Sequence, residues 1–206
     1  MGFAMLSLSL GWSAGALICG QIIQRFGKKP SAVFGALCLA AGSAVMVTFS
    51  TTTSLTSFFI VLGVLGIGMG FVSIATLLIV QDSLVAADLG IATASHQFSR
   101  TLGGTVGVGV TGSFVTLAFS QIVDDLLQSG LKDLPPSLHE HMQQGIDSIF
   151  RPEIQALFSP EVQIALQDAV ARGVMLVFWI TLGTSLLCLL LAAILPSSSA
   201  LRSKRS

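Results

Sequence analysis

Four polar side chains interrupt an otherwise apolar stretch of the sequence: Thr93, His96, Gln97 and Arg100. Their spacing of three and four residues places them on one face of a helix. Histidine can exchange a proton near neutral pH, and an arginine can pair with a carboxylate. An ionised arginine at the centre of a bilayer costs at least about 2.5 kcal/mol. We therefore expect this polar stripe to face protein or a water-filled cavity rather than lipid.

The elements that must hold the stripe are expected to be membrane helices. The chain is 52% hydrophobic and 10% charged, whereas a soluble domain carries about 25% charged residues. Several apolar runs reach the roughly 20 residues that a helical span needs, and their unbroken hydrophobicity excludes barrel strands. The sequence predicts an all-α, polytopic membrane helical bundle with five spans, at about 3–23, 31–50, 56–80, 90–123 and 173–195.

The distribution of lysine and arginine predicts the orientation of the chain. The hairpin "QRFGKKP" and the tail at 196–206 are basic, whereas residues 124–172 hold eight of the ten acidic residues. We expect the hairpin and the tail in the cytoplasm, and 124–172 as an extracytoplasmic loop. The protein should be multi-pass in the plasma membrane, with the bacterial inner membrane as the expected setting.

The 124–172 loop carries two helix-start patterns. "SLHE" at 137–140 has the form of a capping box, and Ser159 followed by Pro160 can begin a second helix. We expect short amphipathic helices on the outer surface. "HEH" at 139–141 lacks the spacing of a metal site, and Cys19, Cys38 and Cys188 have no metal or disulfide pattern. No metal and no cofactor is predicted.

The hairpin has a family resemblance. "GQIIQRFGKK" resembles the G-x-L-A-D-R-x-G-R-K hairpin of the major facilitator superfamily, although Gln24 replaces the aspartate of that motif. The matching positions are Gly20, Arg25, Gly27, Lys28 and Lys29.

A second segment, residues 66–114, is similar to the late spans of the fourteen-span drug:proton antiporters of that superfamily. It has a glycine-rich helix, Gly90 opening the next helix, then Arg100 and the pair Gly103-Gly104. The resemblance covers the last five helices, so the N-terminal half and one further helix of the C-terminal half are absent from this chain. It implies part of the C-terminal half of a major facilitator fold.

Glycines at four-residue spacing predict close helix packing, because small residues must supply helix contacts in lipid. The residues concerned are Gly66 and Gly70 in one helix, and Gly103, Gly104 and Gly107 in another.

The resemblance implies the C-terminal portion of a proton-coupled multidrug or small-molecule exporter that works by alternating access. His96, Gln97 and Arg100 would line the transport path or gate; alternatively, Arg100 staples two helix ends or pairs with Asp82 or Asp88. No acidic residue lies within the expected spans, so the coupling acids would belong to the missing N-terminal half. The expected partners are the lipid bilayer, a small-molecule substrate, and that missing half or a full-length partner; no nucleic acid is expected.

Two other functions remain open. The chain can be an inactive truncated or split-gene fragment, or a non-transporting membrane subunit or small pore that docks on a partner. An enzyme is not predicted, because no Ser/His/Asp set, cysteine nucleophile or phosphate loop stands in a suitable context.

Overall fold

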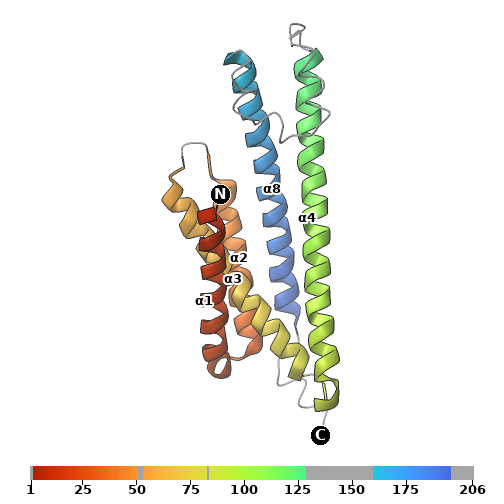
Figure 1. Ribbon diagram of the computed structural model, residues 1–206. Coiled ribbons are helices and arrows are strands. Elements are labelled where there is room, and N and C mark those ends of the chain that lie inside the picture. The colour runs from red at the N-terminus through yellow and green to blue at the C-terminus, as the bar shows by residue number, and fades with distance from the viewer. Residues whose placement is uncertain (1, 51–52, 83, 129–159, 196–206) are drawn as a thin grey trace. The chain divides into compact units, whose positions relative to one another are not determined.

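The computed structural model describes residues 2–50, 53–82, 84–128 and 160–195. Within these ranges the chain is helical and contains no strand, which confirms the all-α prediction (Figure 1). The capping box at 137–140, "HEH" and the basic tail lie outside the described residues. The elements are α1 (Gly2–Phe26), α2 (Lys28–Val47), α3 (Leu55–Asp82), the short 3₁₀ helix η1 (Ala86–Asp88), α4 (Leu89–Gln128) and α8 (Pro160–Ile194).

The chain divides into two compact units. One unit comprises residues 1–106 and 178–206, and holds α1, α2, α3 and the beginning of α4 with the end of α8. The other comprises residues 107–177. In that second unit α4 and α8 approach each other, since a Cβ at Gly173 would lie 3.9 Å from Val115 Cγ1.

The turn between α1 and α2 is shorter than the predicted hairpin. Gly27 alone separates the two helices, and its φ of 90° lies in the region that side chains disfavour. Its N–H donates to the Ile23 carbonyl at 2.9 Å, and its carbonyl accepts from Ser31 Oγ at 2.8 Å. Pro30 is tolerated in the first turn of α2, where no intrahelical donor is required. The basic residues of the motif are therefore helical, and only the glycine makes the turn.

Helices α1 and α3 run parallel and touch backbone to backbone. A Cβ added at Gly66 would lie 2.4 Å from the Leu8 carbonyl oxygen, and one added at Gly70 would lie 2.5 Å from the Ala16 nitrogen. Gly66 and Gly70 therefore lie where the backbones of α1 and α3 approach each other. The same contact uses Gly11, whose added Cβ would lie 2.4 Å from the Gly63 oxygen.

Side-chain contacts to backbone carbonyls show that α1 and α3 keep the same residue offset along their contact. Ser7 Oγ donates to the Phe59 carbonyl at 2.7 Å, and Cys19 Sγ lies 3.7 Å from the Phe71 carbonyl. In both contacts the partners are 52 residues apart in the sequence. A constant offset is what two parallel helices of equal rise produce, so the contact is regular from end to end.

Helix α2 packs on a different face of α3 and also reaches α8 through one hydrogen bond. A Cβ at Gly68 would lie 2.8 Å from the Gly35 oxygen, which brings the backbones of α2 and α3 together. The Oγ atoms of Ser43 and Ser185 are 2.7 Å apart and buried, which joins α2 to the end of α8. Helix α3 therefore lies between two close neighbours.

The interior and exterior of the larger unit have the composition of a membrane bundle. Large apolar side chains such as Phe3, Leu10 and Ile60 are 78%, 70% and 63% exposed. A water-soluble protein would bury such residues, whereas a lipid-facing surface suits them. The buried cluster is instead made mostly of small residues: Cys19, Ile23, Ala32, Ala36, Phe71, Ala75 and Ala192.

Four of the helices are long and apolar enough to cross a membrane: Phe3–Phe26, Lys28–Val47, Leu55–Asp82 and Ala171–Ile194. Helix α4 is 40 residues long, yet it is not among the four, because glycine, serine, threonine and charged residues dilute its apolar content. That α4 crosses the membrane therefore stays a prediction.

Two expectations differ from the structure. The helix predicted from Pro160 is not a separate surface helix, since α8 continues without a break from Pro160 to Ile194. In α4, no described atom lies within 4 Å of a Cβ built at Gly103, Gly104 or Gly107. Their predicted packing role is therefore not realised within the described part of the chain.

Candidate functional site: the polar face of α4

The first turns of α4 are attached to α3 by two hydrogen bonds from the polar stripe. Gln81 Nε2 donates to Thr93 Oγ1 at 3.1 Å, and one turn farther along, His96 Nε2 lies 3.1 Å from Thr76 Oγ1. Thr93 and His96 thus face protein rather than lipid, as the stripe predicts.

Arg100 extends this attachment to α1. Its guanidinium carbon lies 4.4 Å from the centroid of the Trp12 ring, which is a cation–π distance. The predicted pairing of Arg100 with Asp82 or Asp88 is not seen, because Arg100 points to α1. Arg100 does join two helices, as the stapling hypothesis expected, but they are α4 and α1.

Asp82 has a different partner, in the hairpin motif. Lys28 Nζ forms a salt bridge with Asp82 Oδ2 and donates to the Leu78 carbonyl at 3.4 Å. A cation near the last carbonyls of a helix also interacts favourably with the helix dipole. Lys28 therefore fastens the beginning of α2 to the end of α3.

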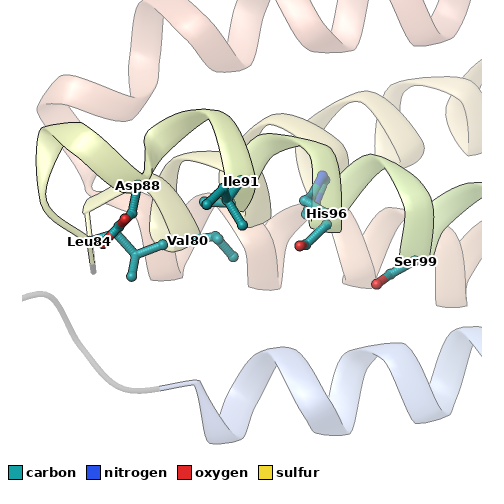
Figure 2. A pocket seen from close by; sticks show the side chains of 8 residues that line it. Val80, Leu84, Asp88, Ile91, His96 and Ser99 are labelled. Carbon is teal, nitrogen blue, oxygen red and sulfur yellow. The ribbon is translucent and has the colours of Figure 1, made fainter.

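A pocket of about 550 Å³ lies beside this attachment. Figure 2 shows Val80 and Leu84 next to the first turns of α4, with His96 and Ser99 farther along that helix. The lining combines an apolar side with hydroxyl, imidazole and carboxylate groups, so the pocket can hold water or an amphipathic molecule. The complete lining is Val80, Leu84, Asp88, Ile91, Ala92, Ser95, His96 and Ser99.

The remaining predicted site residues are not part of these contacts. Gln97 and Arg25 are exposed, and a Cβ built at Gly20 meets no described atom within 4 Å. Lys29 is half-buried. The structure gathers Thr93, His96 and Arg100 on one side of the bundle and brings none of these other residues to them.

The partners of the stripe were missed in the sequence. Thr76 and Gln81 are polar residues within the apolar stretch of α3, and their spacing of five residues matches no simple helical face. No pattern in the sequence around Trp12 indicated that its ring would contact a charged side chain. A polar side chain inside an expected span was the available signal for Thr76 and Gln81, because such groups usually find a partner across helices.

The fold and this attachment define a class: a polytopic helical membrane protein whose spans pack through small residues and hold polar contacts inside the bundle. The chain belongs to the Major Facilitator Superfamily, whose family model matches residues 1–108. It is accordingly a multi-pass membrane protein of a transporter family.

Several curated relatives carry transport names. The chain is 30% identical over 164 residues to the Multidrug transporter protein MdtP of Bacillus subtilis (strain 168), an alignment that covers 77% of this chain and 30% of MdtP. It is 27% identical over 151 residues to the Aspyridones efflux protein of Neocamarosporium betae, covering 72% of this chain and 26% of that protein. It is 35% identical over 112 residues to the MFS-type efflux pump MMF1 of Pseudozyma antarctica (strain T-34), covering 53% and 21%.

The chain spans less than a third of the length of these relatives. No solved structure gives a significant match.

Proposed function

We propose that this chain forms the C-terminal portion of a proton-coupled exporter of drugs or other small molecules, working by alternating access in the plasma membrane. The remainder of the transporter, including its N-terminal half, is the proposed partner. The observation that carries the proposal is the attachment of α4 to both α1 and α3 by Thr93, His96 and Arg100. Farther along the same face of α4, Gly103 and Gly107 follow at three- and four-residue spacing and have no described neighbour within 4 Å.

The succession of polar residues and glycines along one face of α4 suits a wall between two halves of a transporter. Polar residues in membrane helices face a bundle interior or a water-filled cavity, and here Thr93, His96 and Arg100 bind neighbouring helices. Gly103 and Gly107, four residues apart, have no described neighbour within 4 Å. Small residues at this spacing allow another helix to approach closely. We infer that a helix of the missing portion packs there.

Within this proposal Arg100 lines the transport path and holds its wall together. Its cation–π contact with Trp12 ties α4 to α1, and a contact of this kind between exposed groups is worth about 0.5–1 kcal/mol. Both helices belong to the same half of the proposed transporter, so the contact would keep the shape of that wall while the two halves rock. Gln97 is exposed next to it and is assigned to the path itself.

The proposal is tested in a chimera, in which this chain replaces the matching segment of MdtP. We expect the chimera to lower the accumulation of a fluorescent cationic dye in cells whose own exporters are deleted. Arg100→Ala should reduce the export rate by about two- to fivefold, as a loss of about 0.5–1 kcal/mol implies, and Arg100→Lys should keep part of it.

Membrane abundance, measured by immunoblot, is the control for all variants. Unchanged export by Arg100→Ala at equal abundance would remove Arg100 from the mechanism. A chimera that reaches the membrane and exports none of a panel of cationic and neutral compounds would instead support a non-transporting subunit or an inactive fragment.

A further inference from the structure

One ring nitrogen of His96 has a hydrogen-bond partner, and the other has none among the described residues. Nε2 lies 3.1 Å from Thr76 Oγ1. Nδ1 is buried and has no hydrogen-bond partner among the described residues. A buried polar atom left without a partner costs about 1–3 kcal/mol, so such an atom requires an explanation.

The hydrogen bonds of Thr76 determine which ring nitrogen carries the proton. A threonine hydroxyl has a single proton to donate, and Thr76 Oγ1 lies 2.7 Å from the Val72 carbonyl oxygen, which can only accept. Thr76 therefore accepts from His96, and Nε2 is the protonated nitrogen. Nδ1 accordingly presents a free lone pair.

We propose that Nδ1 of His96 is a proton-binding site, filled from the pocket at the α3–α4 contact. Hydronium in the pocket gives a proton to the Nδ1 lone pair, so that one N–H bond forms and water is left. Nε2–H remains the donor to Thr76 throughout. The site can thus load and release a proton without breaking the hydrogen bond that holds α4 to α3.

The pocket provides the route for the proton. His96 belongs to its lining, together with Asp88, Ser95 and Ser99, and its volume is about 550 Å³. One water molecule occupies roughly 30 Å³, so a chain of water molecules fits.

The charges around the site come from four elements. In η1, Asp88 shares the pocket, and on α4, Arg100 lies one turn from His96 and is turned toward Trp12 of α1. On α3, Asp82 is engaged by Lys28 of α2. Asp88 is thus the acid that shares a cavity with the imidazole without a salt-bridge partner among the described residues.

Proton binding itself is independent of transport, although its use in coupling rests on the proposed function. The first measurement therefore uses the whole chain alone, in lipid nanodiscs, with His139→Gln and His141→Gln so that His96 is the one remaining histidine. The chain is labelled with ¹⁵N-histidine, and the ring nitrogens are followed by NMR between about pH 5 and pH 8, the range in which imidazoles titrate.

At the upper end of this range we expect a protonated Nε2 and a bare Nδ1. On acidification Nδ1 should gain a proton reversibly. Thr76→Val should abolish the tautomer preference while leaving a titrating imidazole. Thr116→Val is the matched control, because the Thr116 hydroxyl bonds the Gly112 carbonyl of its own helix at 3.0 Å, and it should change neither. An Nδ1–H tautomer in the parent chain, or an imidazole still neutral at about pH 5, would overturn the proposal.

The second measurement separates the proton site from its use. In the MdtP chimera, His96→Gln should remove the pH dependence of export while dye binding persists. If the NMR titration is as expected and export by His96→Gln keeps its pH dependence, the proton site stands and its coupling to transport is refuted. A chimera that never exports leaves the NMR result to decide the proton site alone.

Discussion

Replacing Gly66 by alanine tests the parallel packing of α1 and α3. The added methyl group would lie 2.4 Å from the Leu8 oxygen, 2.8 Å from the Trp12 nitrogen and 3.0 Å from the Gly11 carbonyl carbon. All three atoms belong to the backbone of α1, so no side chain can rotate away. Ordinary contact begins at 3.4 Å, and α1 must therefore retreat by about 1 Å, the difference from 2.4 Å.

The expected loss of stability follows from two opposing effects. Overpacking a tight contact costs about 1–3 kcal/mol, and a clash with backbone alone belongs at the upper end. Alanine is about 1 kcal/mol more favourable than glycine in a helix. We expect a net loss of about 2 kcal/mol in the free energy of unfolding.

The matched control is Gly183→Ala in α8, where the added methyl group meets no described atom within 4 Å. This control should be neutral or gain up to about 1 kcal/mol. Unfolding of the purified chain by SDS, followed by circular dichroism and by tryptophan fluorescence, measures both variants. Equal midpoints for Gly66→Ala and Gly183→Ala would refute the backbone contact.

Two further predictions use the same unfolding measurement, and a third uses topology reporters. Lys28→Ala and Asp82→Ala should each lower the free energy of unfolding by at most about 1 kcal/mol, because the pair is partly exposed. The double variant should lose no more than the larger single loss, and additive losses would contradict the ion pair. Ser43→Ala should cost about 0.6 kcal/mol, as interhelical hydrogen bonds in membranes do, and Ser185→Ala should add nothing to it. Reporter tags within 130–150 and after the last residue should be found on opposite faces of the membrane; tags on the same face would contradict five crossings.

Much of the fold could be predicted from residue type and period. The apolar runs gave helices, and Gly27 marked the turn, because the alternation of long apolar stretches with short polar breaks has few other solutions in lipid. The direction of the polar stripe was also predictable, since the cost of exposing His96 or Arg100 to lipid leaves protein as the neighbour.

The partners within the site could not be predicted. Pairing with Asp82 or Asp88 was one of the alternatives for Arg100; it lies instead on the Trp12 ring, while Asp82 binds Lys28. The sequence shows which groups need partners, but it does not show how one helix is rotated against another. That rotation determines whether Arg100 meets a carboxylate or an aromatic ring. The G-x-x-x-G spacing of Gly11 and Gly15 was present in the sequence and was overlooked; a Cβ at Gly15 would lie 2.5 Å from the Ile67 oxygen.

The single-residue connection at Gly27 limits how the adjoining helix ends can move. With one residue between them, α1 and α2 cannot tilt independently at that end, and the contacts of Lys28 with Leu78 and Asp82 carry the constraint to α3. A force applied to any one of these three ends is transmitted to the other two. The three helix ends should thus move together as one rigid unit, and any bending should occur toward the opposite ends of the helices.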